Sequence, residues 1–320
     1  MNTNTLIQKL YDEDAYLTTF TACVKEVAGG ELVLDRTAFF PEAGGQLSDT
    51  GTLYAPDGKG GEIALTVRDV QISEGVIRHR LELAEGCADS DGPFVGRRDP
   101  GDDEDASSEL LERLLQPGMT LRGEIDRERR YDFMQQHTAE HIISGLVNAR
   151  FGYDNVGFRL SDNSCTMDYS GVLTPEQIPE LELAANRVIW DNLPVLVSFP
   201  SEEEQESITY RSKKEIASDE LRIVTIPDID TCACCAPHVR HTGEIGLVKI
   251  IRLQNWKGGV RLCTAAGRRA LSLFTEEHDM ITQLARSLST SWENIPDRFQ
   301  KMREETGLLK KELKEYRKNK

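Results

Sequence analysis

Apolar and polar residues alternate in short stretches over residues 1–85, and glycines separate many of these stretches. β-branched residues are frequent in them, as is typical of strands, and Gly29-Gly30 indicates a hairpin. The predicted strands are residues 18–27, 31–34, 63–70, 75–83 and 118–125. Many short strands joined by glycine turns favour a small barrel or sandwich. We therefore predict an N-terminal β-barrel-like domain at residues 1–125.

Residues 88–108 depart from this pattern, because they are polar, acidic and rich in glycine and proline. A segment of this composition buries too little apolar surface to offset the entropy of ordering it. We predict an acidic loop here, within the first domain.

The pattern changes at Arg127, where apolar residues begin to recur with helical spacing and continue to Gly152. A second helix is predicted after Thr174, since a threonine followed three positions later by Gln177 is typical of a helix cap. Strands are predicted at residues 156–160, 165–169, 195–199, 221–226, 246–254 and 259–264. This mixture predicts an α+β domain at residues 126–271.

Residues 272–320 are predicted to be helical. Their apolar residues follow the 3-4 spacing of a coiled-coil seam of about three heptads: Trp292, Ile295, Phe299, Met302, Thr306, Leu309, Leu313 and Tyr316. A seam this short is marginal by itself. We expect it to pack on its own domain or on a partner helix, which makes a homodimer through this C-terminal helix reasonable. The predicted fold class is α+β, with a small N-terminal β-barrel and a C-terminal coiled-coil segment.

The formal net charge of −16 argues against a nucleic-acid partner, because phosphate binding needs lysine and arginine. The charges are unevenly distributed, however. Residues 247–275 contain no acidic residue but carry Lys249, Arg252, Lys257, Arg261, Arg268 and Arg269. A locally basic face suits a polyanionic partner, and an ordinary solvated surface explains the pattern equally well.

The apolar runs are much shorter than a membrane span requires. The N-terminal residues lack a basic region followed by an apolar core, so we predict no signal peptide, no membrane association and a cytoplasmic location. The seven cysteines do not suggest a disulfide framework. Three of them crowd into residues 232–235, which favours metal or redox chemistry.

The first candidate metal-binding segment is QQHTAEH at residues 135–141. His137 and His141 are four positions apart, so they share one face of the predicted helix and offer two ligands to one metal ion. A hydrogen-bonded pair of histidines without a metal is the plain alternative. The order H-x-x-E-H also leaves Glu140 open as the general base of a metal-dependent hydrolase.

The second candidate segment is CACCAPHVRH at residues 232–241. Cys234 and His238 are again four positions apart, and with the first pair they supply three nitrogens and one sulfur. That set suits tetrahedral Zn²⁺. Buried structural thiols and a redox site remain alternatives. Spacing alone does not choose among Cys232, Cys234 and Cys235, or between His238 and His241.

The third segment is FFPEAGGQLSDTG at residues 39–51. Adjacent glycines allow the backbone to approach a ligand and to present N–H groups to it. Gly44 and Gly45 are therefore candidates for substrate binding, and Gln46 is a candidate for reading a polar group. A plain turn between strands is the alternative.

Four motifs in this order resemble the alanyl-tRNA editing proteins of the AlaX family, and equally the editing domain of alanyl-tRNA synthetase. They are the glycine segment from Phe40 to Gly51, the segment from Arg130 to His141, Cys234-x-x-x-His238, and Thr242-Gly243-Glu244-Ile245-Gly246. The resemblance covers residues 15–270. It implies a β-barrel followed by a zinc-binding α+β editing domain.

The resemblance also implies hydrolysis of the ester that joins a misattached serine or glycine to tRNA(Ala). The implied zinc ligands are His137, His141, Cys234 and His238. Because no aminoacylation domain precedes residue 1, the protein is not expected to charge tRNA itself. The alternative function is a non-catalytic, zinc-stabilised tRNA-binding module.

The chain departs from the family pattern at Cys235-Ala236-Pro237, where Gly-Gly-Thr is usual, and at Leu47-Ser48. These changes bear on substrate contacts and leave the metal ligands unaffected. For catalysis, Gln135 and Gln136 are the candidates to orient a water. Ser164 and Thr166 are the candidates to contact the serine hydroxyl of the substrate.

Overall fold

The computed structural model describes residues 7–83, 103–211 and 221–319, and the structural statements below concern these residues. The chain divides into two compact units, Met1–Gly267 and Arg268–Lys320, and each is described by itself. None of the described helices is long and apolar enough to cross a membrane.

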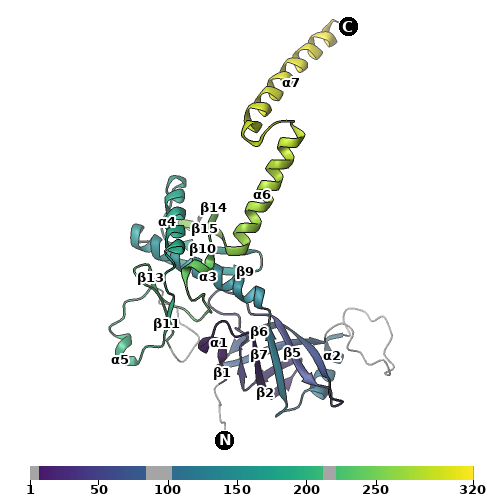
Figure 1. Cartoon of the computed structure of the whole chain (residues 1–320), viewed down its shortest axis with the longest axis vertical. Coiled ribbons are helices and arrows are strands. Elements are labelled where there is room, and N and C mark those ends of the chain that lie inside the picture. Colours follow the sequence, from purple (N-terminus) through teal and green to yellow (C-terminus); the bar gives the residue numbers. More distant parts are fainter. Residues whose placement is uncertain (1–6, 84–102, 212–220, 320) are drawn as a thin grey trace. The chain divides into compact units, whose positions relative to one another are not determined.

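Six antiparallel strands of the first unit close into a barrel in the order β2-β3-β7-β6-β5-β8 (Figure 1). Their bounds are β2 Thr19–Ala28, β3 Glu31–Leu34, β5 Gly51–Pro56, β6 Glu62–Ser73, β7 Val76–Leu83 and β8 Thr120–Ile125. Leu32, Leu53 and Leu65 are fully buried in the barrel core, and they alternate with more exposed neighbours as the period of a strand requires. The predicted barrel is confirmed, and β5 is a strand that the sequence pattern did not reveal.

Three short elements accompany the barrel. The parallel pair of β1 and β4 and the helix that follows β1 have the bounds β1 Gln8–Lys9, α1 Leu10–Glu13 and β4 Arg36–Thr37.

The acidic loop predicted at residues 88–108 ends in a helix, α2 (Asp103–Leu114). The loop prediction is therefore wrong for residues 103–108, and residues 88–102 lie outside the described residues. The physical reason lies further along the helix, where Leu111 is buried in the core. Acidic residues are favourable in the first turn of a helix because of its dipole, so the acidic composition did not exclude one.

Helix α3 (Arg127–Phe151) follows the barrel directly and occupies the centre of the second half of this unit (Figure 1). The Asp126 side chain caps its first turn by accepting a hydrogen bond from Arg129 N, at 3.1 Å. Gly152 ends it with φ 69°, a left-handed conformation that glycine adopts without steric cost. The predicted start and end of this helix are confirmed.

Two antiparallel sheets complete the second half, with strand orders β14-β15-β10-β9 and β11-β12-β13. The strands are β9 Asn155–Ser161, β10 Ser164–Tyr169, β11 Leu196–Ser198, β12 Ile223–Ile226, β13 Asp230–Ala233, β14 Val248–Trp256 and β15 Gly259–Ala266. The helices are α4 Ile178–Trp190 and α5 Glu202–Gln205, with 3-10 turns at Pro175–Gln177 and Thr242–Ile245. The mixed α+β class is confirmed. Strand β13 was not predicted, because its pairing with β12 supplies what its short, polar sequence lacks.

The second unit is helical, with α6 (Gly267–Ser287) leading into it, a 3-10 turn at Trp292–Asn294 and α7 (Ile295–Lys318). The predicted helical segment is confirmed. None of the residues of α7 is buried, so its apolar seam is exposed. Packing of this seam against a second copy of the chain stays a prediction.

A buried ion pair joins the barrel to α3. The Nε atom of Arg130 lies 3.0 and 3.1 Å from the two carboxylate oxygens of Asp49. The same guanidinium donates to the carbonyl oxygens of Ala15, at 2.8 Å, and Ala38, at 2.6 Å. Asp49 also accepts a hydrogen bond from Phe40 N, at 2.6 Å. These bonds compensate the desolvation of both charges. Arg130 and Asp49 therefore stabilise the contact between the barrel and α3.

His79 in the barrel core provides a pH-dependent contribution to stability. Its Nδ1 lies 3.0 Å from the Leu32 carbonyl and its Nε2 lies 2.9 Å from the Thr37 hydroxyl. Burial lowers its pKa from 6.5 to about 4. Since the folded protein disfavours the protonated ring, we expect the contribution of His79 to stability to be constant above pH 6.5 and to fall by about 3 kcal/mol between pH 6.5 and pH 4.

Urea unfolding at a series of pH values measures this loss. A His79→Gln variant should lose part of the pH dependence, whereas replacement of the exposed His278 should leave it unchanged. An NMR titration that places the pKa of His79 near its ordinary value would contradict the prediction.

Candidate metal centre and pocket

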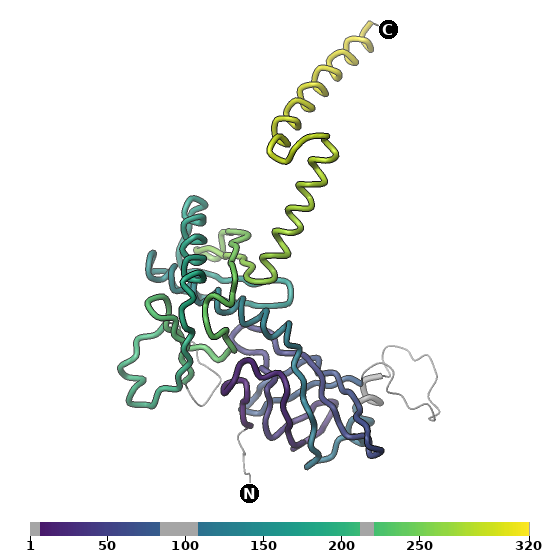
Figure 2. Tube along the Cα trace, viewed as in Figure 1, coloured from purple at the N-terminus to yellow at the C-terminus, as the bar shows by residue number. Residues whose placement is uncertain are grey.

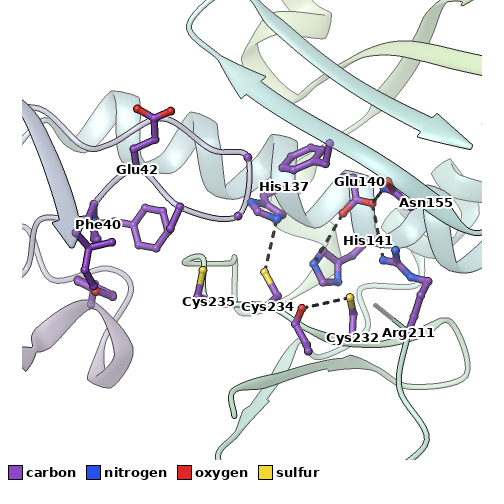
Figure 3. A pocket seen from close by; sticks show the side chains of 18 of the residues that line it. Phe40, Glu42, His137, Glu140, His141, Asn155, Arg211, Cys232, Cys234 and Cys235 are labelled. Carbon is purple, nitrogen blue, oxygen red and sulfur yellow. Dashed lines mark hydrogen bonds and ion pairs between the residues drawn. The ribbon is translucent and has the colours of Figure 1, made fainter. Parts of the chain in front are cut away.

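Four buried side chains from two distant segments meet beside α3. His137 and His141 come from α3, and Cys234 comes from the loop that follows β13 (Figure 3). His238 belongs to the same loop. Their ligand atoms all lie within 4.8 Å of one another. Cys234 Sγ is 3.5 Å from His137 Nε2 and 3.3 Å from His238 Nε2. This buried cluster could hold a metal ion, and the structure brings together all four residues that the resemblance implied as ligands.

The outer nitrogen of each ring has a partner that leaves the inner nitrogen free for a metal. His137 Nδ1 lies 2.8 Å from Gln46 Oε1, which can only accept. His238 Nδ1 lies 3.0 Å from the Thr138 hydroxyl, which itself donates to a backbone carbonyl. His141 Nδ1 lies 2.9 Å from Asp230 Oδ2. The acceptors at His137 and His238 place the proton on Nδ1 and leave the Nε2 lone pair for the centre, as metal-bound histidines require. The Asp230 carboxylate beside His141 Nδ1 favours the same tautomer.

The protonation states of the cluster also suit a metal. Burial, together with the neighbouring His141 and Arg222, holds the pKa of His137 and His238 well below the ordinary value. Burial raises the pKa of the Cys234 thiol, so a bound cation is what would keep it as a thiolate. Nitrogen atoms from three histidines together with a thiolate are a donor set that tetrahedral Zn²⁺ accepts.

Arg222, just before β12, shapes the loop that carries Cys234. Its side chain is buried and donates to the carbonyl oxygens of Cys234, at 2.7 Å, and Ala236, at 2.9 Å. Loop and helix run side by side in the trace (Figure 2), although Cys234 lies 97 positions from His137.

The glycine segment of the barrel docks on strand β9. Leu160 N donates to Gly45 O at 2.7 Å, and Leu47 N donates to Leu160 O at 3.1 Å. Gly44 and Gly45 have φ of 60° and 85°, which favours glycine at both positions. Both glycines line the pocket beside the cluster. Gln46 is fully buried behind His137, so the structure places it as a support for that ring and away from the pocket.

A pocket of about 440 Å³ opens over the cluster between barrel and second half. Its lining includes His137, His141, Cys234 and Cys235, the apolar Tyr11, Phe40 and Phe158, and the polar Glu140, Asn155 and Arg211 (Figure 3). Cys235, which departs from the family pattern, is thus a wall residue of this pocket.

Arg211 and Asp230 form a second layer behind His141. Arg211 donates to both carboxylate oxygens of Asp230, at 2.9 and 3.0 Å. Burial opposes both charges, yet the contacts with His141 and Arg211 hold the pKa of Asp230 below the ordinary value, and Glu140 and Asp230 raise the pKa of Arg211. The sequence did not reveal this layer, because no spacing pattern connects residue 211 with residue 230.

Four other candidate site residues do not line the pocket. Gln135 Nε2 donates to Glu244 O at 2.8 Å, and Gln136 exchanges hydrogen bonds of 2.8 and 2.9 Å with the Ala266 backbone. The structure therefore does not bring either glutamine to the pocket lining, and it does not bring Ser164 or Thr166 there.

Replacement of Gly45 with alanine is expected to undo the docking of this loop. A Cβ at Gly45 would lie 2.3 Å from the Phe158 carbonyl oxygen, in addition to the cost of φ 85° for a non-glycine residue. We expect a loss of about 1–3 kcal/mol of stability or more, together with weaker metal binding, measured by urea unfolding and metal titration. Gly58→Ala is the matched control, since its φ is 72° but no atom lies within 4 Å of the added Cβ. Equal losses in both variants would show that strain alone, and not loop docking, is responsible.

Comparison with known proteins agrees with the resemblance seen in the motifs. A family described as "Threonyl and Alanyl tRNA synthetase second additional domain" matches residues 221–262, and one described as "tRNA synthetases class II (A)" matches residues 2–96. Alanine–tRNA ligases of Thermofilum pendens and Natronomonas pharaonis are each 32% identical to the chain over 96% of its length. That of Pyrococcus abyssi is 30% identical over 95%. The chain spans 31% of the length of each of these relatives.

Proposed function

Because the chain resembles alanine–tRNA ligases along almost its whole length, we propose that it is an editing hydrolase that removes serine or glycine from mischarged tRNA(Ala). The proposed Zn²⁺ ligands are His137, His141, Cys234 and His238. The observation that carries the proposal is the convergence of these four ligand atoms within 4.8 Å beside a pocket of about 440 Å³, which has room for an aminoacyl group. We also propose that the chain consists of a barrel domain (1–125), an editing domain (126–271) and C-terminal helices (272–320). The resemblance to the alanyl-tRNA editing proteins supports this division.

An aminoacyl ester is already activated, so the barrier to its hydrolysis is modest. The site therefore mainly has to position the ester and the attacking water. A bound Zn²⁺ would polarise the ester carbonyl or lower the pKa of a nearby water. The chain itself supplies fixed ring orientations through Gln46, Thr138 and Asp230, which hold the three imidazoles in place. Phe158 and Phe40 give the pocket part of its apolar lining.

Four protein ligands leave a tetrahedral ion without an open position. We infer two ways in which the four residues would serve. They would hold an ion that binds the substrate carbonyl when one protein ligand dissociates, or they would keep the pocket in shape while water attacks the ester. Selection against cognate alanine is proposed to rest on polar groups that are left unpaired when the serine hydroxyl is missing.

Exposed arginines on the four-stranded sheet suit a role in binding the tRNA body. Arg159, Thr166, Cys263 and Arg252 form one row across the open face of the four-stranded sheet, and both arginines are exposed. By contrast, Lys249 is paired with Glu182 at 2.8 Å. Two exposed cations in one row on an acidic protein favour contact with a phosphate backbone.

The decisive test follows the release of amino acid from tRNA(Ala) charged with serine, glycine or alanine. We expect the purified protein to deacylate seryl- or glycyl-tRNA(Ala) much faster than alanyl-tRNA(Ala), with stoichiometric zinc in the same preparation. Tight binding of tRNA without any deacylation would instead identify a zinc-stabilised tRNA-binding module. Hydrolysis of peptides or simple esters that ignores the tRNA body would point to a general metal-dependent hydrolase.

A further inference from the structure

Glu140 is a buried carboxylate that lines the pocket between the two α3 ligands. Its Oε1 accepts hydrogen bonds from the Asn155 side-chain amide, at 2.6 Å, and from the Ser144 hydroxyl. The same oxygen lies 3.8 Å from the Arg211 guanidinium. Among the described residues, these contacts all fall on Oε1.

The second oxygen, Oε2, lies 3.9 Å from His141 Nε2 (Figure 3). That nitrogen is the atom that His141 offers to the cluster. A carboxylate oxygen in this place borders the space where the reacting carbonyl of a bound ester would lie. Since Oε1 is held by its partners, the direction of Oε2 is fixed before any ligand arrives, which is the arrangement expected of a preorganised acceptor.

The charges around Glu140 favour a cation as the group that Oε2 receives. Arg211 is nearby, but its guanidinium already forms two hydrogen bonds with Asp230. Two carboxylates therefore share one guanidinium, and Glu140, at 3.8 Å, is the less closely paired of the two. A buried carboxylate gains most from a charged donor.

We propose that Glu140 is a substrate-binding residue that holds the α-ammonium group of the aminoacyl ester. The inference rests on the proposed function and deepens it, because it names the chemical class of substrate. In an aminoacyl ester the amino group is two bonds from the scissile carbonyl carbon, so the carboxylate beside His141 Nε2 is within reach of it. Esters whose amino group is acylated, as in peptidyl-tRNA, lack the ammonium and are rejected.

The test compares seryl-tRNA(Ala) with N-acetylseryl-tRNA(Ala) in the wild-type protein and in Glu140→Gln. The wild type should prefer the free amine by about ten- to a hundredfold in kcat/KM, the range of one hydrogen bond to a charged group. In Glu140→Gln this preference should fall close to one, with the zinc content unchanged. Glu180→Gln is the matched control, because it neutralises an exposed carboxylate that is paired with Arg150 and does not line the pocket, and it should keep the preference.

An equal loss on both substrates in Glu140→Gln would overturn the inference and assign Glu140 a structural role. So would a wild-type protein that does not distinguish the two substrates. Binding of a non-hydrolysable 3′-serylamido-3′-deoxyadenosine and its N-acetyl form separates this from the proposed function. Amine-dependent binding that Glu140→Gln removes would support the inference even if no ester were hydrolysed, and hydrolysis with equal binding of both analogues would leave the editing function standing without it.

Discussion

Replacement of His238 with alanine is expected to abolish the release of serine from seryl-tRNA(Ala), with a loss on the order of a thousandfold or more. The variant should also lose most of its bound zinc. The physical reason is that His238 Nε2 lies only 3.3 Å from Cys234 Sγ in a buried cluster. Without this imidazole the ion keeps three protein ligands, and the Thr138 hydroxyl faces a cavity.

Metal analysis and deacylation assays on the same preparations measure both losses. His241→Ala is the matched control, because His241 belongs to the same loop but is exposed and is not part of the cluster found among the described residues. It should keep its zinc and most of its activity. Loss of zinc in His241→Ala with retention in His238→Ala would reverse the proposed ligand assignment.

Replacement of Arg130 with alanine is expected to destabilise the protein by about 3–5 kcal/mol, the usual cost of leaving a buried charge without its partner. The Asp49 carboxylate would then remain buried, and among the described residues the Phe40 N–H would be its remaining hydrogen-bond donor. Because the pair joins the barrel to α3, weaker metal binding should accompany the loss of stability.

Urea unfolding of Arg130→Ala, Asp49→Ala and the double variant measures this effect. The double variant should be less destabilised than the sum of the single variants, since it leaves neither charge unpaired. Arg122→Ala, which removes a surface partner of Glu62, should have a much smaller effect. Strict additivity of the two buried substitutions would contradict the role assigned to the pair.

Local sequence patterns accounted for much of the fold. The periodicity and Gly152 predicted the bounds of α3, and the structure adds the Asp126 cap at its start. The two α3 histidines follow from the same periodicity, because residues four apart share a helix face. Spacing alone did not choose Cys234 over Cys232 or Cys235. That choice came from the resemblance. The structure places Cys234 with His137, His141 and His238, and it places Cys232 in a second group with His141 and Asp230.

The features that escaped prediction depend on contacts between distant segments. Helix α2 is acidic and is stabilised by burial of Leu111, which composition does not reveal. Arg211 and Asp230 meet only because the chain returns to β13 after β12. Gln46 was expected to face a substrate, but docking of its loop on β9 turns the side chain toward His137. Such roles follow from tertiary register, and local sequence does not encode that register.

The glycine loop would have to accompany the four candidate ligands if this centre were transferred to another protein. Because the loop leaves the barrel and contacts the His137 ring, the barrel contributes directly to the candidate metal site. A graft of α3 and the Cys234 loop into a foreign scaffold would lack the amide that orients one imidazole. A transplantable version of this centre therefore has to include residues from both halves of the first unit.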